Sequence, residues 1–230
     1  ATYDPAKAKA AYEQRLGKWQ EAVKKARADK KKAPRRPRLQ ASPGASNRVP
    51  ATLYDGMINP IAGYAIKGAI WYQGESNQKH FPEEYGFRFR TMIQAWRQAW
   101  GQGDFPFYYA QLAQFQAVSA APISDNPWVT VCDEQRQTLK LKNTGMAVLN
   151  DIGEALDIHP RNKMDVGKRL SLWALANDYG KKMAAHSGPL YAKHKIKNGR
   201  VIISFSSVGS GLMVATKTLL NDPVPADHPL

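Results

Sequence analysis

Two short polar segments hold the residue types that could do chemistry. The first, residues 73–77, reads Gln-Gly-Glu-Ser-Asn. Glycine lets the backbone approach a ligand closely, and a backbone amide together with an Asn side-chain amide can donate to an oxyanion. Gly74 and Asn77 are therefore candidate oxyanion donors, and Gln73 and Ser76 are further possible site residues. The alternative is a plain turn whose Ser and Asn side chains bond the local backbone.

The second segment, residues 151–160, gathers three carboxylates and one histidine within nine residues. A histidine next to a carboxylate suits general-base catalysis, because the imidazole takes a proton while the carboxylate fixes its tautomer. His159 is thus a candidate base. The alternative is a histidine that only precedes Pro160 at the entry of a helix.

Apolar periodicity predicts the elements that position these segments. Compact apolar runs indicate strands over 68–73, 107–112 and 146–149. Amphipathic patterns indicate helices over 82–100, 130–142 and 160–180. Such alternation predicts an α/β fold with a parallel sheet that is covered on both faces. Sites in such sheets lie at the carboxyl ends of strands, and both polar segments follow a predicted strand.

The net charge of +14 is concentrated near the beginning of the chain. Residues 1–50 hold 14 Lys or Arg against 4 Asp or Glu, whereas the remaining 180 residues hold 19 and 15. Apolar residues at spacings of three and four predict an amphipathic helix over 5–32. Because its stripe includes Trp19, we expect the helix to lie against its own domain. The alternative is an arm that binds nucleic acid or another acidic surface, although no nucleic-acid motif supports it.

The rest of the composition divides the chain and excludes several classes of site. We expect a basic helical arm with a proline-rich linker over 1–48, an α/β core over 49–186, and a β-rich, truncated appendage over 187–230, where 201–205 alternates. The single cysteine, Cys132, excludes an intrachain disulfide. The five histidines lack zinc spacing, so we expect no metal. No apolar run is long enough to predict a membrane span or a signal peptide.

Five strings of residues together resemble the sialate O-acetylesterase family within the SGNH hydrolases. The most specific is Trp-Tyr-Gln-Gly-Glu-Ser-Asn at 71–77, which is followed by Asp-Ile-His-Pro at 157–160. Leu-Tyr-Asp-Gly-Met-Ile-Asn-Pro at 53–60, Asp-Glu-Gln-Arg at 133–136 and Asp-Val-Gly-Lys-Arg-Leu at 165–170 are similar to further family segments. The resemblance covers roughly residues 50–180.

The resemblance implies an incomplete three-layer α/β/α sandwich of the SGNH type, with a basic N-terminal helical arm and a β-rich C-terminal segment. It implies removal of acetyl groups from sugar hydroxyls, in sialic acid or acetylated polysaccharide, through a serine acyl-enzyme without a cofactor. Gly74 and Asn77 match the oxyanion block, and His159 matches the general base. Asp157 is the expected orienting carboxylate. Asp151 is the alternative, because the family's Asp precedes its His by three residues and Asp157 precedes His159 by two. Relatives are generally exported.

The resemblance also implies a nucleophilic serine in an upstream Gly-Gln-Ser-Asn segment, and the chain contains no such segment. Ser76 follows a Gly-x pattern, but a nucleophile elbow also needs glycine two positions later, where Gln78 stands. Ser210 lies in a Gly-Ser-Gly turn. We therefore identify no nucleophile and expect a truncated piece in which residues 1–48 are an internal insertion.

A piece without its first strand is expected to expose apolar strand edges. It would then be completed by another chain or form a homo-oligomer. The alternative function is a catalytically inactive carbohydrate-binding or scaffold protein that keeps the pocket without the serine.

Overall fold

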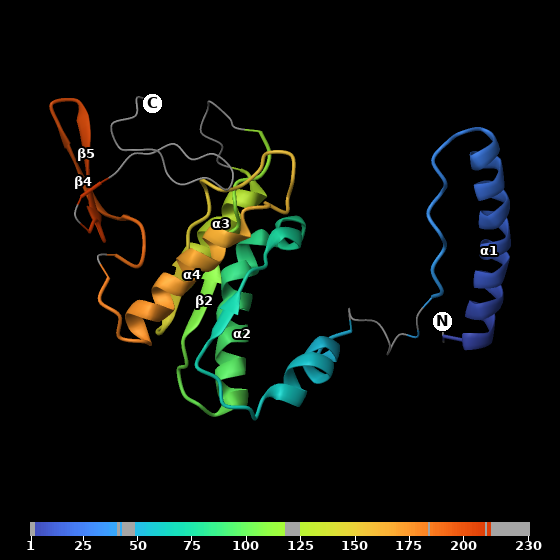
Figure 1. The fold of residues 1–230 in the computed structure, drawn as a ribbon, viewed down its shortest axis with the longest axis horizontal. Coiled ribbons are helices and arrows are strands. Elements are labelled where there is room, and N and C mark those ends of the chain that lie inside the picture. Colours follow the sequence, from blue (N-terminus) through green and yellow to red (C-terminus); the bar gives the residue numbers. More distant parts are fainter. Residues whose placement is uncertain are drawn as a thin grey trace. The chain divides into compact units, whose positions relative to one another are not determined.

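A computed structural model describes residues 3–40, 42, 49–117, 125–183, 185–209 and 211–212. Ser210, residues 43–48 of the predicted linker and residues 213–230 of the predicted appendage lie outside the described residues. Contacts between Cα atoms group the chain into two compact units, Ala1–Gly63 and Tyr64–Leu230 (Figure 1). Each unit is described by itself.

The first unit is built on α1, Pro5–Ala28, which begins at the Asp4 cap. Asp4 accepts bonds from two backbone amides of the first turn, and proline follows it at the first helical position, which is the arrangement that favours helix initiation. The helix ends four residues before the predicted end. The chain then returns along α1 (Figure 1), since Trp19 Nε1 donates to Pro34 O at 2.8 Å and the Tyr3 hydroxyl donates to Gln40 O at 3.0 Å. The unit also holds a π-helix, Tyr54–Ile58, and a 3-10 helix, Asn59–Ile61.

The second unit contains a sheet of three parallel strands in the order β1-β2-β3. The strands are β1 Ala69–Trp71, β2 Phe107–Ala110 and β3 Thr144–Ala147. They confirm the predicted α/β class with a parallel sheet. The third strand begins two residues earlier than predicted because Gly145 carries no apolar side chain. A Cβ atom there would lie 2.4 Å from the Trp173 ring, so packing requires glycine at this strand position.

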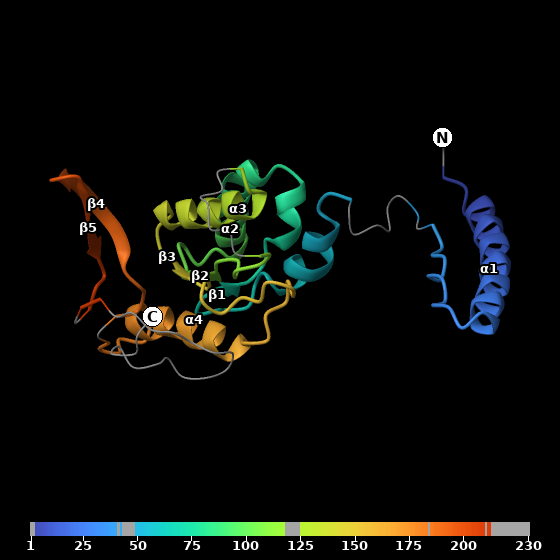
Figure 2. The same ribbon diagram turned by 90° about the horizontal axis from the view of Figure 1, so that it is seen from above.

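Helices cover both faces of this sheet (Figure 2). On one face lie α2 Tyr85–Trp100, after a 3-10 turn at Pro82–Glu84, and α3 Pro127–Gln137, before a 3-10 turn at Thr138–Lys140. They pack on β2 through a buried cluster that includes Phe89, Phe107, Tyr109 and Val131. On the other face lies α4 Lys163–Asn177, whose Val166 and Leu170 pack with Tyr108 and Ala147. None of the helices in the described ranges is long and apolar enough to cross a membrane.

The edge of the sheet at β1 exposes an apolar side chain. Ile70 pairs with Tyr108 in the sheet register, yet Ile70 is 72% exposed whereas Tyr108 is 6% exposed. The difference arises because Tyr108 packs with the α4 cluster, through a ring contact with Trp173. An apolar side chain on an outer strand is the feature expected where a sheet lacks a neighbour.

A separate antiparallel hairpin follows α4. It pairs β4 Leu190–Lys197 with β5 Arg200–Ser206, so the β structure predicted at 201–205 is present and the first strand was missed. Asn198 and Gly199, between the strands, have φ of 54° and 70°. Positive φ at both central residues is the type I′ geometry that Asn-Gly favours.

Candidate functional site

Three loops leave the carboxyl ends of the sheet. Loop A, residues 72–77, follows β1; loop B, residues 111–117, follows β2; loop C, residues 148–162, follows β3. Neighbouring strands lie about 4.8 Å apart, so the ends of β1 and β3 are about 10 Å apart with β2 between them. All the predicted site residues of this unit lie in loops A and C, namely Gln73, Gly74, Ser76, Asn77, Asp151, Asp157 and His159.

Loop A is joined to loop B by a buried glutamine. Gln135, on α3, is fully buried; its Nε2 donates to Gln73 O at 3.2 Å, and its Oε1 accepts from Leu112 N at 2.9 Å. A buried amide bonded at both ends fixes the two backbones relative to each other, because leaving either group unpaired is costly. Sequence reasoning missed this role, although Gln135 lies in one of the strings that carry the family resemblance.

A buried tyrosine supports loop A from the other side. The Tyr85 hydroxyl, on α2, donates to the same Gln73 carbonyl at 2.9 Å. Burial raises the pKa of Tyr85 to about 12, so the phenol stays protonated and remains a donor at neutral pH. Gln73 O therefore accepts two side-chain bonds, from α2 and from α3.

The predicted oxyanion donors lie together in loop A. Gly74 has φ 154° and ψ −16° and caps the 3-10 helix Glu75–Lys79, and Asn77 N donates to Gly74 O at 2.9 Å. Gln73 Nε2 donates to Asn77 Oδ1 at 2.8 Å, which uses the Asn77 side-chain oxygen and leaves its amide group as a donor. Gly74 N donates to the carboxylate of Glu75 at 2.9 Å. An anionic oxygen thus already lies on one predicted donor, and an ester oxyanion has to replace it.

A hollow of about 260 Å³ borders this loop. Gln73, Asn77 and Arg88 are polar residues that line it. Its other walls are mostly aromatic, and Trp71 Nε1 is buried there without a hydrogen-bond partner in the described structure. The lining residues are Trp71, Gln73, Asn77, Tyr85, Arg88, Phe89 and Met92. A small space with apolar walls and an amide donor suits a small neutral group such as an acetyl. Ser76, by contrast, is exposed on the 3-10 helix.

In loop C, Asp157 bonds the backbone of His159. Asp157 Oδ1 accepts from His159 N at 2.8 Å, an Asx turn of the kind that aspartate favours. The distance from Asp157 Oδ1 to His159 Nδ1 is 3.7 Å, longer than a hydrogen bond. The imidazole is 83% exposed. The two residues are adjacent as the sequence suggested, and Asp157 fixes the turn rather than the ring.

The other two carboxylates of loop C are paired with arginines. Both oxygens of Asp151 accept from Arg169, at 2.6 and 2.5 Å, and these bonds raise the pKa of Arg169. Glu154 accepts from the backbone and the side chain of Arg161, which lowers the pKa of Glu154. In the part of the chain that the structure describes, no three His, Cys, Asp or Glu side chains converge as metal ligands do.

Backbone contacts also join loop C to loop B. Gln116 N donates to Ala155 O at 3.0 Å. Gly153 packs so closely on loop B that a Cβ atom would lie 2.0 Å from Gln114 O, so only glycine fits there. Loop B is therefore the common neighbour of loops A and C.

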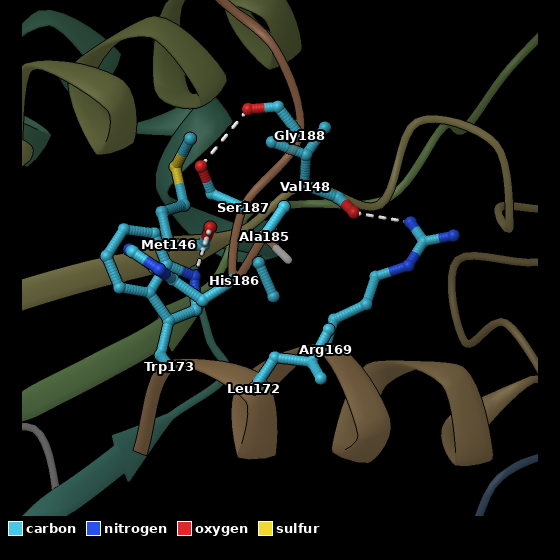
Figure 3. Close-up of a pocket in the computed structure, with 10 residues that line it drawn as sticks. Met146, Val148, Arg169, Leu172, Trp173, Ala185, His186, Ser187 and Gly188 are labelled. Atoms are coloured by element: carbon cyan, nitrogen blue, oxygen red, sulfur yellow. Dashed lines mark hydrogen bonds between the residues drawn. The ribbon is translucent and has the colours of Figure 1, made fainter. Parts of the chain in front are cut away.

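A larger cavity, of about 400 Å³, lies beside β3 and α4 (Figure 3). Trp173 Nε1 donates to Met146 O at 3.1 Å, and the His186 ring meets the Trp173 ring edge-on with centroids 4.6 Å apart. Arg169 contributes one wall through its bond to Val148 O. None of the residues predicted for catalysis lines this cavity. The smaller hollow at Asn77 is therefore the candidate site.

Comparison with known proteins places this arrangement in a family. The family model described as carbohydrate esterase, sialic acid-specific acetylesterase, matches residues 41–175. Sialate O-acetylesterase of Mus musculus is 33% identical over 171 residues, 67% of this chain and 32% of the relative; that of Homo sapiens is 32% identical over 160 residues, 62% and 30%.

A solved structure agrees with these sequence matches. A carbohydrate acetylesterase from Xanthomonas citri has a TM-score of 0.61 and 39% identity over 67% of this chain and 35% of that protein. The chain spans about a third of the length of the curated relatives it matches. The family model covers more than half of the chain, which confirms the resemblance drawn from the motifs: the chain belongs to the sialic acid-specific acetylesterase family of carbohydrate esterases.

Proposed function

We propose that this chain carries the oxyanion-hole and general-base portions of a carbohydrate O-acetylesterase. The observation that carries the proposal is the hollow of about 260 Å³ at loop A, which Asn77 lines and beside which Gln135 and Tyr85 fix the backbone next to Gly74. Donors held in advance at the place where charge develops are what stabilises an oxyanion. The substrate class is an acetylated carbohydrate, sialic acid or an acetylated polysaccharide.

The proposed chemistry uses His159 as the base. A serine oxygen attacks the acetyl carbonyl carbon while His159 takes the serine proton. The carbonyl oxygen becomes an oxyanion that accepts bonds from Gly74 N and Asn77 Nδ2, after the Glu75 carboxylate has left Gly74 N. The bond to the sugar oxygen then breaks, and His159 returns its proton to that oxygen. Water then attacks the carbonyl carbon of the acyl-enzyme while His159 takes a proton from the water. The bond to the serine oxygen breaks, His159 returns the proton to that oxygen, and acetate is released.

Asp157 is the proposed orienting carboxylate for His159. Its 3.7 Å distance to Nδ1 needs only a small movement to become a hydrogen bond, whereas both oxygens of Asp151 are already bonded to Arg169. Asp157 is therefore favoured over Asp151. The nucleophile is not identified in this chain, because no Gly-Gln-Ser-Asn segment is present and Ser76 is exposed on a 3-10 helix.

The finer architecture is part of the proposal. We assign the core, 49–186, to an SGNH-type α/β/α sandwich, the arm to 1–48 and the β-rich appendage to 187–230. The exposed Ile70 on β1 supports a complementing chain or a second copy at that edge. Size-exclusion chromatography with light scattering tests whether a second copy binds at the β1 edge. Association supports it, and a monomer at all concentrations contradicts it.

Hydrolysis of p-nitrophenyl acetate tests the chemistry, with this chain and its His159→Ala and Ser76→Ala variants. Activity lost only in His159→Ala supports the assigned base. Activity lost in both variants makes Ser76 the nucleophile and contradicts the proposed roles. Activity kept in His159→Ala contradicts the base.

If no variant exceeds the buffer rate, the chain lacks its nucleophile as proposed, and binding becomes the test. An O-acetylated sugar should then bind more tightly than its deacetylated parent, and Asn77→Ala should remove the difference. Equal binding of both sugars to the unaltered chain would contradict an acetyl site.

A further inference from the structure

Residues 3–40, called the scaffold below, concentrate positive charge. They consist of α1 and its flanking residues together with the return segment, residues 34–40, which lies along α1. They hold thirteen Lys or Arg and four Asp or Glu. Two of the four acidic residues pair with lysines, Asp4 with Lys7 and Asp29 with Lys31. Most of the basic side chains of this segment are therefore left facing solvent. The rest of the chain shows no comparable excess, since the 180 residues after residue 50 hold 19 basic and 15 acidic side chains.

The return segment fixes this charge in place. Its six residue steps from Pro34 to Gln40 span about 19 Å when extended, against about 21 Å for the fourteen helical steps of α1 from Pro5 to Trp19. The two hydrogen bonds at its ends are thus consistent with an extended chain laid antiparallel along α1. The Arg36 guanidinium lies 5.9 Å above the Trp19 ring, which adds a third contact.

Two rows of basic side chains result. Lys7, Lys18 and Lys25 are exposed and are spaced by eleven and seven residues, so they share one side of α1. Arg35, Arg36 and Arg38 are exposed on the return segment and line one surface hollow. None of these three arginines has an ion-pair partner within the described residues. Cations without an ion pair among the described residues are therefore present on α1, at Lys18 and Lys25, and on the return segment.

We propose that residues 3–40 bind a carboxylated polysaccharide. The identity of the polymer rests on the proposed function, because the same chain carries a carbohydrate esterase core. The guanidinium forks of Arg35, Arg36 and Arg38 fit carboxylates with two parallel bonds. Since both units belong to one chain, binding at the arm raises the concentration of the polymer, and of its acetyl esters, around the esterase core.

The contacts favour an acidic sugar polymer over single-stranded nucleic acid. Proteins that bind single-stranded nucleic acid offer exposed aromatic rings for base stacking. In residues 3–40 the three aromatic side chains are Tyr3, Tyr12 and Trp19, and all are half-buried. Two of them bond the return segment, and Arg36 covers the Trp19 ring. The scaffold thus offers cations without a stacking surface.

Fluorescence anisotropy with labelled polysialic acid tests the proposal on the full chain. Dextran is the neutral polysaccharide for comparison, and single- and double-stranded DNA represent nucleic acids. We expect binding of polysialic acid that weakens as salt is added, no binding of dextran, and weaker binding of both DNAs at the same salt concentration. Tighter binding of either DNA would overturn the proposal in favour of nucleic acid, and absence of polysialic acid binding at low salt would overturn it outright.

A triple variant locates the binding surface. Arg35→Gln, Arg36→Gln and Arg38→Gln together should weaken polysialic acid binding about tenfold to a hundredfold, as expected when three cations near an anionic surface are lost. The matched control removes three exposed lysines of the other unit, Lys168→Gln, Lys181→Gln and Lys182→Gln, and should change binding less than about twofold. Equal losses in both triple variants would show non-specific attraction and refute the site.

Circular dichroism checks that α1 persists in the arginine variant. Binding is measured without turnover, so an inactive chain that binds polysialic acid separates this proposal from the esterase chemistry. Acetate release from a neutral acetylated sugar, in contrast, tests the esterase site without involving the arm.

Discussion

Loops A and C lie at the same edge of one sheet but are held by different forces. The backbone of loop A accepts bonds from two buried side chains, Gln135 and Tyr85. Loop C also contacts loop B through its backbone, but its side-chain contacts include two ion pairs near the surface, between Asp151 and Arg169 and between Glu154 and Arg161. The backbone of loop A is therefore bonded by buried side chains, whereas the charged side chains of loop C form ion pairs at the surface.

This difference matches what each loop is proposed to do. Oxyanion donors stabilise a transition state best when they cost nothing to reorganise, and burial supplies that rigidity. The general base needs a carboxylate that orients it, and His159 lies on an exposed turn with Asp157 Oδ1 3.7 Å from its Nδ1. Surface ion pairs contribute little and respond to salt and pH, so loop C should be the more easily perturbed loop.

The largest effect is expected from Gln135→Met, which keeps the side-chain volume and removes both amide bonds. Leu112 N is then left unpaired in the core, whereas Gln73 O keeps its bond from Tyr85. We expect the free energy of unfolding to fall by about 1–3 kcal/mol. Chemical denaturation measures it. Gln137→Met, two positions along the same helix and partly exposed, is the control and should change stability by less than about 0.5 kcal/mol. Equal losses in the two variants would remove Gln135 as the anchor.

Gly74→Ala should have the next largest effect. Its φ of 154° is rarely adopted by alanine, and the new Cβ would lie 3.3 Å from Gln135 Nε2. We expect a loss of about 1–2 kcal/mol. Gly167→Ala is the control, and it should raise the free energy of unfolding instead of lowering it. Gly167 lies within α4 with nothing near its Cβ position, and alanine favours a helix over glycine by about 0.5–1 kcal/mol. Thermal melts of both variants report the signs.

Tyr85→Phe removes one of the two bonds to Gln73 O. The carbonyl keeps its bond from Gln135, so we expect a smaller loss, about 1 kcal/mol. Tyr179→Phe, on an exposed ring, should be neutral. A loss in Tyr85→Phe as large as that in Gln135→Met would mean that α2 anchors loop A as strongly as α3 does, which would contradict the expected order.

Glu154→Gln should have the smallest effect, and the effect should depend on pH. Bonds from the Arg161 backbone and side chain lower the pKa of Glu154 in the folded chain. A lowered folded pKa stabilises the fold above the unfolded pKa, about 4.3, and this contribution disappears as the pH falls through the folded value. The melting temperatures of the variant and the unaltered chain should thus differ slightly at pH 7 and converge in acid. A difference that grows in acid would contradict the sign.

The sequence predicted the class of fold, and the candidate site residues that it named follow the carboxyl ends of β1 and β3. The apolar run before Gly74 and the polar run after β3 sufficed, because sites in parallel sheets follow the carboxyl ends of strands. Periodicity misplaced elements whose ends depend on capping. α3 begins at Pro127, three residues before the predicted start, because Asn126 caps it by accepting from Trp128 N.

Two further features escaped the pattern for different reasons. The missed strand β4 is followed by Asn198-Gly199, a dipeptide that favours a hairpin turn. The strand was not predicted because its sequence mixes lysines with apolar residues. The role of Gln135 had no such signal. In the sequence alone, a buried glutamine of a helix cannot be distinguished from a glutamine on the surface. Only the tertiary structure brings Gln73 O to Nε2 and Leu112 N to Oε1 of the Gln135 side chain.

Hydrogen exchange measured by mass spectrometry tests the contrast between the two loops most directly, and it requires no turnover. Peptides that cover 72–79 should exchange more slowly than peptides that cover 151–162 in the unaltered chain, because burial protects loop A. Gln135→Met should accelerate exchange in 72–79 and leave 151–162 unchanged. Equal exchange of the two loops, or a Gln135→Met variant with unchanged protection of 72–79, would contradict a core-anchored oxyanion loop.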